Sequence, residues 1–237
     1  MRLVFLHALP LDGHQWDGQR EILPGATIAP TLYDFGNTLS AWAVGALDAA
    51  GEGPLIVVGN SVGGSCALEM ARSAPDRIAA LVLIGTKAGH RPEPEFRDRF
   101  ISSLQNDPDN TVRNWIDGLL SPAVNSEIRQ QIHAIASGQS ADDLIKGVRA
   151  FHSRPDATDV LKSWNKPLVI IHGEHDPIFA GTRARSDANP PTVRTHIIAN
   201  CGHYVNLEQP SALSAILNDL ITVAMPTSAS PEGADVG

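Results

Sequence analysis

Residues 55–65 have the sequence LIVVGNSVGGS, which predicts a strand, a sharp turn and a helix in succession. It begins as a short apolar run without polar alternation, which is typical of a strand buried on both faces of a sheet. The residues from Val62 to about Ser73 then predict a helix. Between strand and helix, residues 59–63 have the form G-x-S-x-G, in the strand–turn–helix context that gives this pattern structural meaning.

The turn around Ser61 is expected to be sharp and strained. A serine at this place takes a positive φ, which lifts its hydroxyl above the edge of the sheet. Gly59 and Gly63 are needed because a Cβ at either position would collide across the turn. The first N–H groups of the following helix favour developing negative charge there. The alternatives are an incidental serine in a glycine-rich turn and a phosphate-binding loop, although the GxxxxGK[ST] lysine is absent from the sequence.

The rest of the chain alternates strands with helices. Short β-branched runs bounded by Gly or Pro predict further strands at residues 2–6, 26–29, 80–85, 168–173 and 193–198. Apolar residues at helical spacing predict helices over residues 39–50 and 213–221. This alternation implies right-handed crossovers and a mostly parallel sheet flanked by helices, so the predicted class is α/β.

One region departs from this alternation. From about His90 to Trp164 the sequence has no convincing strand, only helix-like segments separated by Pro and Gly. We therefore expect one discontinuous core domain, residues 1–89 and 165–225, with an all-helical cap of residues 90–164 inserted between two core strands. Residues 226–237 are small, polar and contain Pro and Gly, so we expect a disordered tail.

Composition excludes several classes of protein. The 237 residues include 18 basic and 26 acidic ones, a formal net charge of −8 without a basic stripe, so neither nucleic acid nor an anionic membrane is an expected partner. The sequence lacks a signal-peptide pattern and any apolar run near the ~18 residues of a membrane span. Two cysteines make no disulfide framework. The prediction is a soluble cytoplasmic protein, with no indication of its oligomeric state.

A serine hydroxyl reacts when a base removes its proton and an acid orients the base. In a fold of this type, the acid and then the histidine follow the serine at the ends of later strands. Asp176 and His203 each come just after a predicted strand, in that order. This placement predicts a triad of Ser61, His203 and Asp176, with Glu174 and His175 as competitors that the spacing disfavours.

The sequence HGEHD at residues 172–176 also raises the possibility of a metal site. His172 and His175 would point to opposite faces of a strand, because their separation is odd. The sequence offers no second histidine pair to complete a tetrahedral set, so neither a metal nor another cofactor is expected.

Two backbone N–H groups are candidates for stabilising the oxyanion that forms when a carbonyl is attacked. One belongs to Val62, the residue after the serine, and the other to Leu9, in the loop after the first strand. His7 in the same loop is expected to be structural.

Together these residues resemble the α/β-hydrolase superfamily, in its serine esterase and lactonase-like branch with a helical cap, over nearly the whole chain. The segments that carry the resemblance are VFLHALPLDGHQWDGQ (oxyanion loop), ATIAPTLYDFGNT, VVGNSVGG (nucleophile elbow), RPDATDVL, PLVIIHGEHDPI (acid strand) and IANCGHYVNLEQP (histidine loop). The resemblance implies that Ser61, Asp176 and His203 are the catalytic triad.

The sequence also departs from the family pattern. It begins at what resembles the family's third strand, so the usual N-terminal hairpin is expected to be missing. Ala8 replaces the glycine of the oxyanion loop, and Thr31 replaces an Asp of structural role. Tyr204 follows His203 where carbon–carbon bond hydrolases of the superfamily tend to carry Trp. Ser61 argues against the halide- and epoxide-cleaving relatives, which use an Asp nucleophile.

The predicted reaction is acyl transfer from a small carboxylic ester or lactone, through an acyl-enzyme intermediate. The candidate pocket residues are Trp115, Leu119, Phe151, Phe179 and Tyr204. Arg149 and Arg154 of the cap could meet a substrate carboxylate, but the favoured expectation is that both are solvated. Carbon–carbon bond hydrolysis, thioester hydrolysis and perhydrolysis on the same triad are alternatives. An alternative of another class is a ligand receptor or signalling protein with slow or no turnover, because a fold does not define a function.

Overall fold

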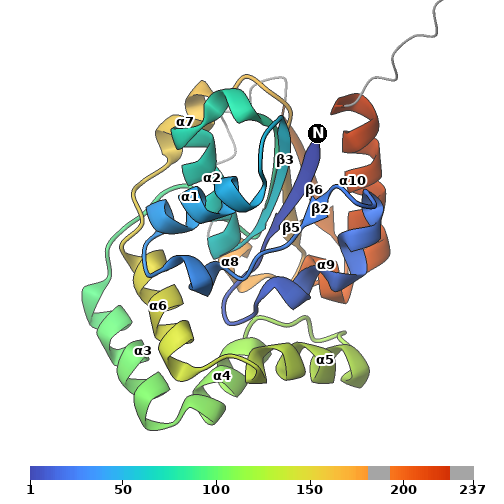
Figure 1. Cartoon of the computed structure of the whole chain (residues 1–237). Coiled ribbons are helices and arrows are strands. Elements are labelled where there is room, and N and C mark those ends of the chain that lie inside the picture. The colour runs from blue at the N-terminus through green and yellow to red at the C-terminus, as the bar shows by residue number, and fades with distance from the viewer. Residues whose placement is uncertain (181–192, 225–237) are drawn as a thin grey trace, which may run out of the picture.

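The computed structural model describes residues 1–180 and 193–224 (Figure 1). Its strands are β1 (Arg2–Leu6), β2 (Thr27–Ile28), β3 (Leu55–Asn60), β4 (Ile78–Ile84), β5 (Leu168–Gly173) and β6 (Val193–Ile198). They form a six-stranded sheet in the order β2-β1-β3-β4-β5-β6, and every neighbouring pair is parallel. The predicted α/β class and the predicted strands are confirmed, and the described sheet contains no antiparallel hairpin.

The helices of the described residues follow the alternation that the sequence predicts. The α-helices are α1 (Leu39–Ala49), α2 (Val62–Ser73), α3 (Pro94–Asn106), α4 (Pro108–Asp117), α5 (Ser126–Ser137), α6 (Ala141–His152), α7 (Thr158–Ser163), α8 (Pro177–Ala180), α9 (Val205–Glu208) and α10 (Pro210–Ala224). The 3-10 helices are η1 (Gly13–Ile22), η2 (Leu32–Phe35) and η3 (Pro75–Arg77). None of the helices in these ranges is long and apolar enough to cross a membrane.

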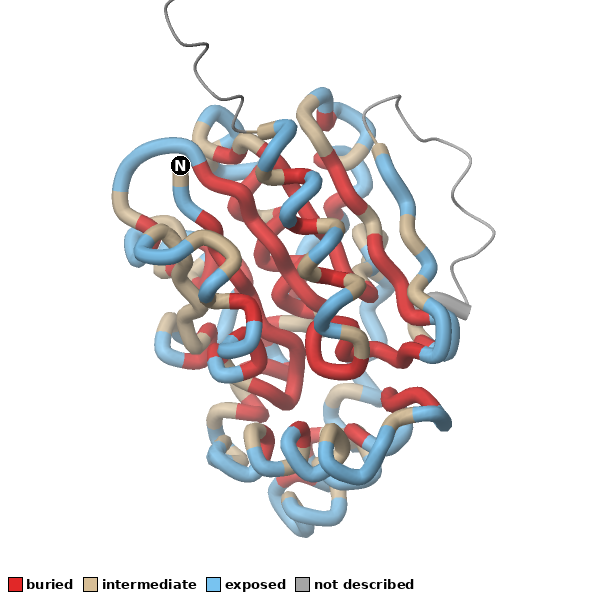
Figure 2. The backbone as a smooth tube through the Cα atoms, turned by 90° about the vertical axis from the view of Figure 1, so that its right-hand side faces the viewer, coloured by how far each residue is buried: buried red, intermediate tan, exposed pale blue. Residues whose placement is uncertain are grey.

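Successive side chains of the central strands enter two different hydrophobic cores, because side chains alternate between the faces of a sheet. Leu6 and Val57 pack with α1 and α2 on one face. Phe5 and Val58 pack with η1 and α10 on the other, where the ring of Phe5 stacks on that of Trp16 with 4.7 Å between centroids. The central strands are therefore buried along most of their length, as Figure 2 shows, and their sequences do not alternate.

Helices α3 to α6, which we call the inserted helices, follow β4 and lie below the carboxyl edge of the sheet in Figure 1. No strand interrupts the described chain between β4 and β5, as the sequence predicts. Helix α7 instead packs beside α2, where Arg72 Nη2 lies 3.0 Å from Asp159 Oδ1. The division into core and cap domains stays a prediction, and the expected disordered tail lies outside the described residues.

Candidate active site

The strand order places the candidate residues at one point of the sheet. The chain leaves β1 toward β2 on one side and returns to add β3 on the other side of β1. The loops that follow β1 and β3 therefore diverge, and such a switch point opens a crevice at the carboxyl edge of a parallel sheet. Leu9 follows β1 and Ser61 follows β3, while Asp176 and His203 follow β5 and β6.

Ser61 has an unusual backbone conformation, with φ 55° and ψ −115°. A positive φ costs a non-glycine residue about 1–2 kcal/mol, so the surrounding structure must hold it in place. The Ser61 N–H donates to Ile84 O at 2.8 Å, and Ser61 O accepts from the N–H groups of Gly64 and Ser65. Ser61 occupies the N-cap of α2, yet its hydroxyl makes no capping hydrogen bond, unlike most N-cap serines. The hydroxyl therefore has no role in capping the N-terminus of α2.

The glycines beside Ser61 are required by close backbone approach. A Cβ on Gly59 would collide with the backbone of Gly63 across the turn, as predicted. A Cβ on Gly63 would collide with the backbone of Leu6 and His7, at the end of β1. The G-x-S-x-G sequence thus lets α2 begin in contact with the loop after β1.

His203 and Asp176 form a buried pair. The distance from His203 Nδ1 to Asp176 Oδ2 is 2.8 Å, and the two residues are 1% and 2% exposed. Burial raises the pKa of the Asp176 carboxyl, but the hydrogen bond from His203, the positive charge that His203 has when protonated and the N–H of Ile178 outweigh it, so the pKa lies below its ordinary value. An ionised carboxylate only accepts hydrogen bonds, so Nδ1 carries the proton and the lone pair of the neutral ring is on Nε2. This is the tautomer that a general base needs.

Gly85, directly after β4, lies against this pair and is not among the residues predicted from the sequence. Its φ is +56°, and a Cβ built on it would lie 2.8 Å from Asp176 Oδ2 and 2.8 Å from two atoms of the His203 ring. Gly85 directly follows Ile84, which accepts the Ser61 N–H. The end of β4 therefore contacts both the serine turn and the His–Asp pair.

Glu208 of α9 hydrogen-bonds to the backbone on both sides of His203, and it too is not among the residues predicted from the sequence. This buried carboxylate accepts hydrogen bonds from the N–H groups of Gly202 and Tyr204, at 2.9 and 3.2 Å. It accepts a third from Ser121 N–H at 3.0 Å, in the segment after α4. His203 N–H in turn donates to Leu119 O at 2.9 Å. The sequence signal was an acidic residue five positions after the histidine, in NLEQP.

The two candidate oxyanion donors lie in the loops that meet at the switch point. The N–H of Val62, the first residue of α2, has no intrahelical partner. No group of the described residues accepts a hydrogen bond from the N–H of Leu9, whereas Leu9 O accepts from Tyr204 Oη at 3.2 Å. The peptide bond between Leu9 and Pro10 is cis. Both donors are thus available, and their role stays a prediction.

His7 is structural in this loop. It is fully buried, its Nε2 accepts from Leu32 N–H at 2.8 Å, and its Nδ1 lies 3.1 Å from Ala8 O. Because Nε2 accepts, Nδ1 carries the proton and the ring is neutral. Burial lowers the pKa of His7 to about 4, which keeps it neutral at physiological pH.

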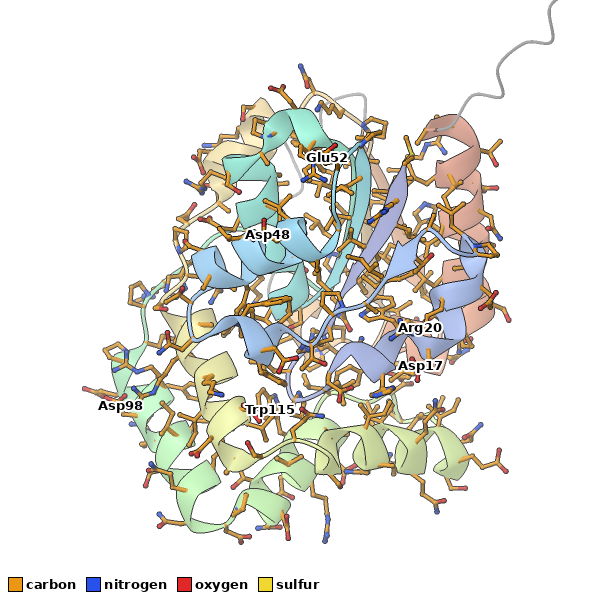
Figure 3. The ribbon with its side chains drawn as sticks, viewed as in Figure 1. Asp17, Arg20, Asp48, Glu52, Asp98 and Trp115 are labelled. Atoms are coloured by element: carbon orange, nitrogen blue, oxygen red, sulfur yellow. The ribbon has the colours of Figure 1, made fainter. Side chains whose placement is uncertain are left out.

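Three of the predicted pocket residues meet in one apolar cluster. Leu119 and Tyr204 pack together in the buried cluster that includes Ala8 of the oxyanion loop. Trp115 lies where the inserted helices meet the rest of the chain (Figure 3) and packs edge-on against Phe100, with 4.7 Å between ring centroids. The structure therefore brings Leu119 and Tyr204 next to His203, and Trp115 packs against their cluster as well as against the core cluster that contains Leu9.

The arginine prediction is wrong for Arg154, which is only 8% exposed. Its guanidinium carbon lies 3.8 Å from the centroid of the Phe151 ring, and Nη1 donates to Phe151 O. Arginine stacks on aromatic faces because the guanidinium is planar and weakly hydrated, and this contact occupies the Phe151 ring. Arg149 is exposed, as expected, and the side chain of Phe179 lies outside the described part of the structure.

The described residues contain no group of three or more His, Cys, Asp or Glu side chains that could hold a metal ion. His172 of the HGEHD sequence is buried, and burial lowers its pKa to about 4. The side chains of Ser61, Asp176 and His203 lie at this edge of the sheet together with the neighbouring backbone N–H groups.

Comparison with known proteins agrees with this fold. Residues 3–216 match the model of the alpha/beta hydrolase family, and the chain belongs to this family. This confirms the predicted family and the predicted hydrolase class.

Two curated relatives extend over most of the chain. One is a 2-succinyl-6-hydroxy-2,4-cyclohexadiene-1-carboxylate synthase from Enterobacter sp. (strain 638), 25% identical over 92% of this chain and 91% of its own length. The other is a pimeloyl-(acyl-carrier protein) methyl ester esterase from Aromatoleum aromaticum, 26% identical over 92% of this chain and 97% of its own length. Among solved structures, a thermophilic esterase from Thermogutta terrifontis has a TM-score of 0.81 and 25% identity, covering 94% of this chain and 90% of that one.

Proposed function

We propose that this protein is a serine hydrolase that cleaves a small carboxylic ester or lactone through an acyl-enzyme intermediate. Ser61 is the nucleophile, His203 the base and Asp176 the residue that orients it. One observation carries the proposal: residues 84–85 contact both a buried, hydrogen-bonded His203–Asp176 pair and the turn of Ser61. Ser61 has a strained backbone, and its hydroxyl does not cap the helix. Strain of this kind persists where the surrounding structure over-determines it, and such places cluster at active sites.

The reaction follows from these groups. His203 Nε2 takes the proton of the Ser61 hydroxyl while Oγ attacks the carbonyl carbon, and Asp176 stabilises the resulting imidazolium. The N–H groups of Leu9 and Val62 donate to the tetrahedral oxyanion. The intermediate collapses, and the alcohol leaves with the proton from His203. A water molecule, deprotonated by His203, then attacks the acyl group and releases the acid and free Ser61.

The surroundings favour a substrate that is small and partly apolar. His203 and Asp176 are almost fully buried, and the cluster of Ala8, Leu119 and Tyr204 beside them is apolar. Removing water from such a site strengthens the interaction between the oxyanion and its donors. The names of two relatives, a methyl ester esterase and a thermophilic esterase, support ester cleavage as the class of reaction.

A fluorophosphonate probe tests the nucleophile directly, since it forms a covalent adduct with an activated serine. We expect mass spectrometry of a digest to locate the adduct on Ser61. Ser61→Ala should abolish turnover of p-nitrophenyl acetate and of a short-chain lactone, with an unchanged melting temperature because the hydroxyl makes no capping bond.

Ser65→Ala is the matched control, because Ser65 is buried one turn along the same helix and its hydroxyl has no partner in the described structure. It should keep wild-type activity. Full activity in Ser61→Ala would remove Ser61 from its proposed role. Absence of triad-dependent turnover on esters, thioesters and lactones would favour the receptor alternative instead.

A further inference from the structure

A buried network of side-chain amides connects the loops of the candidate site. Its centre is Gln15 of η1, which is fully buried. Gln15 Oε1 accepts from the Ala8 N–H at 2.7 Å, and Gln15 Nε2 donates to Asn60 Oδ1 at 2.8 Å and to Asn206 Oδ1 at 2.9 Å. One side chain thus joins the oxyanion loop, the residue before Ser61 and helix α9.

The donor and acceptor atoms of this hydrogen-bond network can be assigned in only one way. The Ala8 N–H can only donate, so the oxygen of the Gln15 amide must face it and the nitrogen must face the two Asn oxygens. Asn60 Nδ2 in turn donates to two carbonyl oxygens, those of Ile84 at 3.1 Å and His203 at 3.2 Å. Asn206 Nδ2 likewise donates to the backbone oxygen of Gln15 at 2.6 Å. The orientation of each of the three amides is therefore determined by a backbone N–H or carbonyl group.

Each end of the network is attached to a proposed catalytic group. Ala8 precedes Leu9, whose N–H is the candidate oxyanion donor. Asn60 precedes Ser61 and binds the carbonyl of His203. Gln15 is the shared partner of both ends, so its length sets the separation between the oxyanion donor and the Ser61–His203 pair.

We propose that Gln15 is a positioning residue for hydrolysis, which acts by holding the Leu9 N–H at a set distance from Ser61 and His203. This inference rests on the proposed function. A shift of about 1 Å in a catalytic group can cost about 100-fold in rate, and loss of one oxyanion donor costs about 100- to 1,000-fold in kcat. Such losses affect kcat because the oxyanion exists only in the transition state and the intermediate.

The test compares substitutions at Gln15 with the same substitutions at Gln19. Gln19 lies in the same 3-10 helix, is also buried, and bonds to Asn206 but to no other residue of the network. Gln15→Met fills a similar volume without an amide. We expect it to lower kcat for p-nitrophenyl acetate about 30- to 100-fold, with KM changed less than about threefold. Gln19→Met should keep kcat within about threefold of wild type.

A second pair of variants keeps the test decisive if Gln15→Met does not fold. Gln15→Asn keeps the amide but is one methylene shorter, so it cannot span both Ala8 and Asn60, and kcat should fall at least about tenfold relative to Gln19→Asn. Equal kcat in the Gln15 and Gln19 variants, or a loss confined to KM, would overturn the positioning role. An inactive wild-type protein that takes no fluorophosphonate would instead refute the proposed function, and the inference with it.

Discussion

Gly85→Ala tests whether the end of β4 sets the geometry of the His203–Asp176 pair. The substitution adds one methyl group at a position with φ +56°, 2.8 Å from Asp176 Oδ2 and from His203 Nδ1 and Cε1. Ordinary contacts of a Cβ begin at 3.4 Å, so the pair must move by about 0.6 Å or the backbone of β4 must shift.

Two costs add in this variant. The positive φ costs about 1–2 kcal/mol for an alanine. Overpacking of a tightly packed site costs a further 1–3 kcal/mol or so. We therefore expect Gly85→Ala to lose about 2–5 kcal/mol of unfolding free energy. Because the displaced atoms are those of the proposed base and its partner, kcat should fall about 10- to 100-fold.

Gly25→Ala is the matched control. Gly25 has a similar φ of +70°, but its added Cβ would meet no atom within 4 Å. It should therefore show the backbone cost alone, about 1–2 kcal/mol, with wild-type kcat. Urea unfolding measures the first quantity and initial rates on p-nitrophenyl acetate the second. If Gly85→Ala is as active and as stable as Gly25→Ala, the packing argument is wrong.

Two further predictions concern buried ionisable groups. In the unfolded chain, His7 becomes protonated as the pH falls below the ordinary histidine pKa of 6.5. In the folded chain, it becomes protonated only near its lowered pKa of about 4. The free energy of unfolding should therefore fall as the pH drops from 6.5 toward 4, by about 3 kcal/mol from this residue. Urea titrations at pH 7 and 4.5 should show a smaller fall for His7→Gln, and an equal fall would contradict the assignment. Glu208→Gln weakens three charge-assisted hydrogen bonds to backbone N–H groups, so it should lose about 2–3 kcal/mol at pH 7. Glu174→Gln, at an exposed carboxylate, should lose less than about 1 kcal/mol, and similar losses in the two variants would refute the role given to Glu208.

Local patterns were sufficient to predict most of the sheet. The strand predicted at 168–173 coincides with β5, and the helix predicted from Val62 to Ser73 coincides with α2. These elements are predictable because an apolar run without alternation reflects burial on both faces, and the spacing of glycines reflects close backbone approach. The order of Ser61, Asp176 and His203 along the chain likewise follows from where parallel strands end.

Other features could not be predicted, because they depend on partners far apart in the sequence. Gln15 and Asn206 are 191 residues apart, and neither carries a local pattern that indicates a role. Gly85 directly follows a strand, an ordinary place for a glycine, and only the fold shows that the His203–Asp176 pair lies against it. Arginine side chains are usually exposed, yet that of Arg154 is buried on the face of the Phe151 ring.

Sequence alone is enough to predict the α/β class, the strained turn at Ser61 and the strands after which Asp176 and His203 follow. Each of these depends on the preferences of a few consecutive residues, which a sequence displays directly. How the loops at the carboxyl edge contact one another, through Gln15, Glu208 and Gly85, is visible only in the folded chain. Buried polar groups must find hydrogen-bond partners, and which partners they meet depends on loops brought together by the strand order.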